Sequence, residues 1–155
     1  MIQFNLGSPT DPPGASELGI DVAAGLIFRN GKLLITQRRR DDHLGGLWEF
    51  PGGKREASET FQDCLRRELR EELGIEVRIG ALLASVTHAY PEKTVHVKFY
   101  RCELERQGPR AIGCQALAWV GPGELEQFQF PAADKTLLED LRTSPELWLD
   151  SAGPR

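Results

Sequence analysis

The chain has 155 residues, of which 40% are hydrophobic and 27% are charged, and these values are typical of one globular domain with a buried core. Its formal net charge of −4 gives no reason to expect binding to long duplex nucleic acid, and no apolar run is long enough to cross a membrane. The three cysteines have no metal-site spacing and the N-terminus lacks the features of a signal peptide. We therefore expect reduced thiols in a cytoplasmic protein.

The composition divides the chain into three parts. Residues 1–17 are rich in Pro, Gly and Ser, which predicts a poorly ordered N-terminal tail. Residues 18–145 contain no repeat or linker and predict one domain. Residues 146–155 end in a similar composition and predict a C-terminal tail.

Strand and helix signals follow one another along the domain. Two apolar runs within residues 20–39 are joined by Asn30-Gly31, a strong hairpin signal, and a loop with a short apolar segment at 47–50 comes next. Residues 60–73 predict a helix, with Thr60 and Asp63 as a capping box and Gly74 as its end. Further strands are expected at 75–90, 94–104 and 115–120, and short helices at 122–128 and 132–143. The fold class is therefore α/β or α+β with a mixed sheet.

The charges of the helix at 60–73 are arranged unusually. At about 100° per residue, the apolar residues form one buried stripe, which comprises Phe61, Leu65, Leu69 and Leu73. Glu68 and Glu72 fall on this stripe and Glu71 falls beside it, whereas a solvated helix laced with ion pairs would expose its carboxylates. Partly buried carboxylates repel one another, and a bound divalent cation such as Mg²⁺ removes that penalty. The helix therefore predicts a metal site.

The segment around this helix resembles the Nudix box. The match comprises Gly53, Glu59 and the run from Arg67 to Ile75, and residues 46–54 ("GLWEFPGGK") are similar to the MutT-like branch, whose members cleave nucleoside triphosphates. The resemblance covers roughly residues 21–142. It implies the Nudix α/β/α sandwich, with a mixed central sheet and the box as a loop–helix–loop. It also implies hydrolysis of a nucleoside triphosphate to the monophosphate and pyrophosphate.

The roles of the family's box residues carry over to the matching positions. The implied metal ligands are the carboxylates of Glu68, Glu71 and Glu72 and the carbonyl of Gly52. Glu59 and Arg67 would shape the loop and orient the helix. The metal is Mg²⁺, with Mn²⁺ as an alternative; it would neutralise phosphate oxygens and polarise a water molecule while a carboxylate takes the proton.

Several residues outside the helix are candidate substrate contacts. Arg38 matches a position that contacts phosphate in the MutT-like branch, and Lys54 either contacts phosphate or pairs with a neighbouring glutamate. Phe50 either stacks on a base or fills the core, and the core is favoured for an aromatic residue in a β segment. Lys93 follows the segment at 87–90 ("THAY") near the expected pocket mouth, and His43 is assigned no role.

Asp134 bears on base specificity. It begins the last predicted helix, at the position that reads the base edge in the MutT-like branch. Specialists for oxidised guanine often carry Asn there, whereas branches that act on cytidine nucleotides often carry Asp. An ionised Asp accepts a hydrogen bond and so suits an amino group such as cytosine N4. The alternative is that Asp134 only adds negative charge to the first turn of a helix.

One departure from the family pattern concerns the general base. Many relatives carry a glutamate six residues before the tryptophan of the late strand, and counting back from Trp119 leads to Gly113. We therefore expect Glu71 or Glu72 to accept the proton. The substrate is either an oxidised or modified nucleotide such as 8-oxo-dGTP or a CTP-type nucleotide. The alternatives are an RNA 5′-pyrophosphohydrolase and a non-catalytic nucleotide sensor, and the resemblance also allows a homodimer.

Overall fold

The computed structural model describes residues 19–149, so the N-terminal tail expected at 1–17 lies outside the described residues. Strands dominate the first two thirds of the described chain and short helices dominate its end. In chain order the elements are β1 (Gly19–Arg29), β2 (Lys32–Gln37), β3 (Trp48–Glu49), β4 (Gly52–Lys54), α2 (Phe61–Leu73), β5 (Val77–Ala89), β6 (Thr94–Leu104), β7 (Ala116–Val120), the 3-10 helices η1 (Pro122–Gln127) and η2 (Ala132–Asp134), α3 (Lys135–Thr143) and the 3-10 helix η3 (Pro145–Trp148).

The strands form one mixed sheet, as the sequence predicts. Its main order is β3-β2-β1-β6-β5, while β4 pairs with β1 and β7 pairs with β2. Only the β1–β6 pair among these strands is parallel. The predicted hairpin joins β1 and β2 through Asn30 and Gly31, which both have positive φ angles of 53° and 75°. A second hairpin joins β5 and β6.

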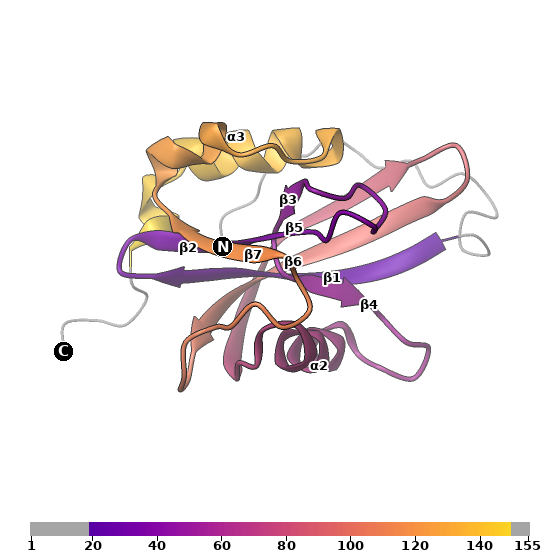
Figure 1. Ribbon diagram of the computed structural model, residues 1–155, viewed down its shortest axis with the longest axis horizontal. Helices are drawn as coiled ribbons and strands as arrows, with labels where there is room; N and C mark the ends of the chain where they lie inside the picture. Colours follow the sequence, from indigo (N-terminus) through magenta and orange to yellow (C-terminus); the bar gives the residue numbers. More distant parts are fainter. Residues whose placement is uncertain (1–18, 150–155) are drawn as a thin grey trace.

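Helices cover both faces of the sheet, with α2 on one side and α3 on the other (Figure 1). Central strands β1 and β2 are apolar at consecutive positions because they are buried on both faces. Along β2, Leu33 and Ile35 pack in the cluster on the α3 side, whereas Leu34 packs in the cluster that contains the buried residues of α2. This is the α/β/α sandwich that the resemblance implies.

The boundaries of α2 follow local signals in the sequence. The Thr60 hydroxyl accepts a hydrogen bond from the backbone N–H of Asp63, and Gly74 ends the helix in the left-handed conformation with a φ of 66°. Leu65, Leu69 and Leu73 are fully buried against the sheet. The packing of this stripe fixes the rotation of the helix and therefore the direction of its glutamates.

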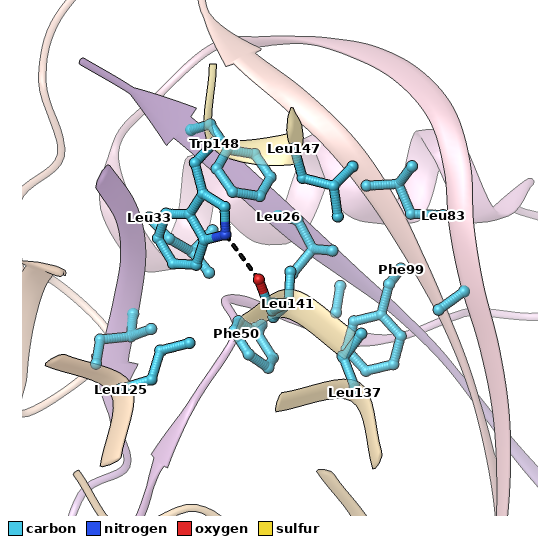
Figure 2. Packing of buried hydrophobic residues seen from close by; sticks show 14 of the residues in the cluster. Leu26, Leu33, Phe50, Leu83, Phe99, Leu125, Leu137, Leu141, Leu147 and Trp148 are labelled. Atoms are coloured by element: carbon cyan, nitrogen blue, oxygen red, sulfur yellow. Dashed lines mark hydrogen bonds between the residues drawn. The ribbon is translucent and has the colours of Figure 1, made fainter. Parts of the chain in front are cut away.

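The domain extends beyond the predicted end at residue 145. Residues 146–149 are not a tail, because Leu147 and Trp148 are only 3% exposed and belong to the core on the α3 side. Figure 2 shows the Trp148 indole N–H directed at the carbonyl oxygen of Leu141, at 2.8 Å. Arg101 donates to the carbonyl oxygens of Leu147 and Leu149. The rest of the expected tail, residues 150–155, lies outside the described residues.

Candidate active site

A cavity of about 250 Å³ opens between β1, the β3–β4 turn, the β5–β6 hairpin and η2. Its lining combines apolar side chains with charged ones. Six of the residues predicted from the sequence line it, namely Arg38, Phe50, Gly52, Lys54, Lys93 and Asp134. The fold thus brings residues from distant parts of the chain into one site of a size suited to a small polar ligand.

Three cations face this cavity. The guanidinium of Arg38 donates to Glu49 Oε1 at 2.9 Å and to the carbonyl oxygen of His43 at 2.7 Å. Lys54 and Lys93 form no ion pair with any residue between 19 and 149, so the predicted pairing of Lys54 with a neighbouring glutamate is not found. Two uncompensated ammonium groups in one cavity favour an anionic ligand.

Phe50 belongs both to the core and to the cavity wall. Its side chain is only 5% exposed, it stacks on Phe130 with ring centroids 5.2 Å apart, and it meets Phe99 edge-on at 5.9 Å. The core interpretation of Phe50 is therefore confirmed. The same ring presents an apolar surface to the cavity.

Two carboxyl groups lie toward the η2 side of the cavity. Burial, followed by the nearby charge of Glu49, raises the pKa of Asp134 to about 7. Burial also raises the pKa of Glu49, although the Arg38 guanidinium opposes this. The pKa of Tyr90 rises through burial and through the charge of Asp134. Asp134 can therefore change protonation near neutral pH.

Arg67 joins the loop before α2 to the helix itself. Its guanidinium donates to both carboxylate oxygens of Glu59 at 2.7 and 2.8 Å, and to the carbonyl oxygen of Lys54 at 3.1 Å. The same group reaches Glu68 at 2.9 Å and Glu71 at 3.3 Å. The hydrogen bond from Arg67 lowers the pKa of Glu59 to about 2. Arg67 therefore connects three carboxylates across the loop and the second and third turns of the helix.

Glu72 differs from these three carboxylates, because it forms no ion pair with a cationic side chain among residues 19–149. Its Oε2 atom is buried and has no hydrogen-bond partner in the described chain. Burial, followed by the charges of Glu49 and Glu68, raises the pKa of Glu72 to about 8, and a backbone hydrogen bond from Gly52 only partly opposes this. The charge of Arg38 also opposes the rise, as the smallest of these contributions, so the surroundings of this carboxyl group favour its protonated form.

Gly53 brings the loop against the carboxylate of Glu68. A Cβ atom at this position would lie 2.2 Å from the Cδ atom of Glu68, so no residue with a side chain fits without displacing the carboxylate. Strand β4, which lines the cavity, therefore packs directly against Glu68 of α2. Gly52, whose carbonyl is the predicted further ligand, belongs to the same strand.

The arrangement fits a divalent cation held by oxygen ligands. Between residues 19 and 149 no three Asp, Glu, His or Cys side chains are grouped closely enough to hold a metal ion, and Glu68 and Glu71 accept hydrogen bonds from Arg67. The orphaned oxygen of Glu72, with Glu49 and Glu68 repelling it, nevertheless has the environment that a hard cation stabilises. Glu68, Glu71 and Glu72 could hold such an ion, together with the Gly52 carbonyl.

Comparison with known proteins gives the family. A model of the NUDIX domain matches residues 23–140, which is most of the chain. The chain belongs to the Nudix family. It is 40% identical over 120 residues to the CTP pyrophosphohydrolase of Escherichia coli strain K12, covering 77% of this chain and 89% of the relative. It is also 37% identical over 123 residues to the 8-oxo-dGTP diphosphatase of Haemophilus influenzae, covering 79% of this chain and 90% of the relative.

Solved structures agree with this membership. The solution structure of the E. coli ORF135 protein has a TM-score of 0.71 and 38% identity, covering 86% of this chain and 97% of that chain. A structure from a study of MutT from Aliivibrio salmonicida and Vibrio cholerae has a TM-score of 0.66 and 28% identity, covering 79% and 95%. The sandwich described above is therefore the Nudix fold in its MutT-like form, and Arg67 to Ile75 lie in its box.

Two residues of this Nudix site were not predicted. Glu49 lines the cavity beside Arg38, and its signal was a single acidic residue inside the apolar segment at 47–50. His43 also lines the cavity, and its ring lies 6.2 Å from that of Tyr90, which contacts His88 at 4.4 Å. The sequence gives no hint that the loop at 38–47 folds back over the Nudix cavity.

No helix among residues 19–149 is long and apolar enough to cross a membrane.

Proposed function

We propose that this Nudix domain is a Mg²⁺-dependent pyrophosphohydrolase that converts a nucleoside triphosphate to the monophosphate and pyrophosphate. The observation that carries the proposal is Glu72, which has one buried, unpartnered carboxylate oxygen. It lies on helix α2, whose Glu68 packs against Gly53 in the wall of a cavity that also presents unpaired cations. An anionic substrate and an acidic helix are compatible when a metal ion lies between them. The names of the related CTP pyrophosphohydrolase and 8-oxo-dGTP diphosphatases support the same reaction class.

The metal is held by the glutamates of the box. Glu68, Glu71 and Glu72 supply carboxylates and Gly52 supplies its carbonyl, with Mn²⁺ able to replace Mg²⁺. When bound, the ion neutralises phosphate oxygens and acidifies the attacking water. Arg67 and Glu59 hold the loop and the helix in register through their paired hydrogen bonds.

The reaction also needs a group in the Nudix box that accepts a proton from the attacking water. Gly113 offers no carboxylate, so the acceptor comes from the helix itself. Glu71 is 60% exposed and is held only by contacts of 3.3 and 3.4 Å to Arg67. It is therefore freer than Glu72 to take the proton from water.

The cations of the cavity bind the polyphosphate. Lys54 and Lys93 are unpaired within the described residues and lie at the cavity surface. Arg38 is already oriented by Glu49 and by the carbonyl of His43. A planar guanidinium held in this way suits phosphate oxygens. Phe50 supplies an apolar surface for the nucleoside.

The base is proposed to be of the cytosine type. Asp134 and Glu49 place two carboxyl groups near one another in the cavity, and ionised carboxylates accept hydrogen bonds from an exocyclic amino group. The CTP pyrophosphohydrolase of E. coli, at 40% identity, supports this choice. The 8-oxo-dGTP diphosphatases among the relatives make that nucleotide the second candidate.

Base preference is tested by measuring kcat/KM for CTP, 5-methyl-dCTP, 8-oxo-dGTP and the other normal nucleoside triphosphates. With a pKa of about 7, Asp134 is ionised at pH 8, so we expect cytosine nucleotides to lead there. Asp134→Asn, which keeps the shape and loses the charge, should lower kcat/KM for CTP by about 10-fold or more. An unchanged base preference in this variant would remove Asp134 from base recognition. If the protein hydrolysed a 5′-triphosphate RNA and none of these nucleotides, it would be an RNA 5′-pyrophosphohydrolase instead.

A further inference from the structure

The segment at residues 108–114, between β6 and β7, lies against the C-terminal end of α2. The backbone N–H of Arg110 donates to the carbonyl oxygen of Leu73 at 3.0 Å, and the N–H groups of Ile112 and Gly113 donate to that of Glu72 at 3.1 and 2.9 Å. Carbonyl groups in the last turn of a helix have no partner within the helix. The segment supplies these partners, and two of its three hydrogen bonds converge on the backbone of Glu72.

The contact at Gly113 is close. A Cβ atom there would lie 3.2 Å from the Cα atom and 3.3 Å from the Cγ atom of Glu72. Nearly every side chain would therefore press on both the backbone and the side chain of this glutamate. The position at which the family pattern led us to expect a carboxylate is the position where the main chain approaches Glu72 most tightly.

Arg39 connects this segment to the loop that carries the phosphate-binding candidate. Its guanidinium donates to the carbonyl oxygen of Ile112 at 2.8 Å, and Arg39 directly follows Arg38 in the chain. Nearby, the N–H of Gln115 donates to the carbonyl oxygen of Gln37 at 2.9 Å. A continuous path of hydrogen bonds thus runs from the loop over the cavity to the backbone of Glu72.

We propose that residues 110–113 form a backbone brace that positions Glu72 for metal binding, and that Arg39 is a positioning residue that ties this brace to the substrate loop. The inference rests on the proposed metal role of Glu72. Oε2 of Glu72 has no hydrogen-bond partner within the described chain, so apart from the hydrogen bond from Gly52 the position of the carboxylate depends on how the backbone of Glu72 is held. Groups that orient a metal ligand commonly affect metal affinity strongly without touching the ion.

Substitutions at Gly113 distinguish two explanations for this glycine. Either its backbone positions Glu72, or the position has merely lost a carboxylate that binds the metal. We would measure Mn²⁺ binding to the nucleotide-free protein by electron paramagnetic resonance, for Gly113→Ala and Gly113→Glu. The brace predicts that both variants bind Mn²⁺ about 10-fold more weakly, because a Cβ atom 3.2 Å from the Cα atom of Glu72 presses on this residue. Tighter Mn²⁺ binding by Gly113→Glu would mean that the loop can supply a ligand and would overturn the brace. Unchanged binding by Gly113→Ala would overturn it as well.

Arg39 provides a second test that leaves Gly113 intact. Arg39→Ala should weaken Mn²⁺ binding by about 3–10-fold, Arg39→Lys should recover part of the loss, and thermal unfolding shows whether each variant is folded. Arg40→Ala is the matched control, because the neighbouring Arg40 side chain is exposed and makes no hydrogen bond or ion pair within residues 19–149. At saturating metal, Arg39→Ala should keep its kcat and show only a raised metal requirement.

The two proposals fail in different ways. Parent-like Mn²⁺ binding by Glu72→Gln would overturn the metal assignment and therefore the proposed function. Parent-like binding by Arg39→Ala, together with weakened binding by Glu72→Gln, would overturn the brace alone.

Discussion

At the residue scale, Glu72 is where function and stability conflict. Its carboxyl group is buried beside Glu49 and Glu68, and one oxygen lacks a partner in the described chain. A site arranged for a bound cation destabilises the protein when the cation is missing. The same residue therefore allows a stability test that is independent of activity.

Glu72→Gln should stabilise the metal-free protein while abolishing turnover. The folded-state pKa of about 8 lies above the ordinary value of 4.5, so the folded chain retains a proton that the unfolded chain has lost. The contribution of Glu72 to the free energy of unfolding is therefore fully present below its ordinary pKa of 4.5 and is lost as the pH rises through about 8. Urea unfolding with a chelator should show the variant more stable by about 1–2 kcal/mol at pH 8, with a smaller difference at pH 5. A less stable variant at pH 8 would contradict this.

Metal binding should depend on pH for the same reason. Glu72 must lose its proton before it can bind a cation, so the affinity for Mn²⁺ should increase by up to about 10-fold per pH unit below pH 8 and level off above it. Calorimetry in buffers of different ionisation enthalpy would detect the released proton. A pH-independent affinity between pH 6 and 8 would show that Glu72 is not the titrating ligand.

At the element scale, the loop and helix of the box depend on Arg67. Arg67→Ala removes hydrogen bonds to Glu59, Glu68 and the Lys54 carbonyl together, so we expect a loss of about 1–3 kcal/mol in the free energy of unfolding and a fall in kcat. Arg70→Ala is the control on the same helix, because Arg70 pairs with Glu76 at an exposed site. Such pairs contribute roughly 0–1 kcal/mol. Equal losses in the two variants would contradict a special role for Arg67.

Elements with local signals in the sequence could be predicted, and the structure confirms their positions. The ends of α2 follow from Thr60 and Gly74, and the helical spacing placed Glu68 and Glu72 on the inner side. The β1–β2 turn followed from Asn30-Gly31. Residues 122–128 were expected to form a helix and contain the 3-10 helix η1, and 132–134 form a second 3-10 turn before α3.

Features that depend on distant contacts could not be predicted. The parallel pairing of β1 with β6 joins segments about 75 residues apart, and no local pattern encodes it. Glu49 becomes a site residue only because Arg38 and Glu72 reach it in space. The roles assigned to the box glutamates came from the family resemblance, whereas the brace at 110–113 required the backbone geometry.

At the scale of the whole molecule, the end of the chain completes the core on the α3 side. Trp148→Ala should lower the free energy of unfolding by about 3–5 kcal/mol, because the indole is buried against Phe28, with ring centroids 5.3 Å apart, and donates to Leu141. Leu149→Ala is the control, because this neighbouring side chain is 67% exposed and should change stability by less than about 0.5 kcal/mol. Denaturant unfolding checks both, and a small effect of Trp148→Ala would mean that residues 146–149 are dispensable. The homodimer that the resemblance allows stays a prediction, which sedimentation of the purified chain tests.

The most direct test of the proposed function is phosphorus NMR of CTP incubated with the protein and Mg²⁺. CMP and pyrophosphate should appear, a chelator should stop the reaction, and Glu72→Gln should form neither product. CDP and inorganic phosphate would show attack at a different bond. Binding of CTP and of the other nucleoside triphosphates without any product would contradict the hydrolase and indicate a nucleotide sensor.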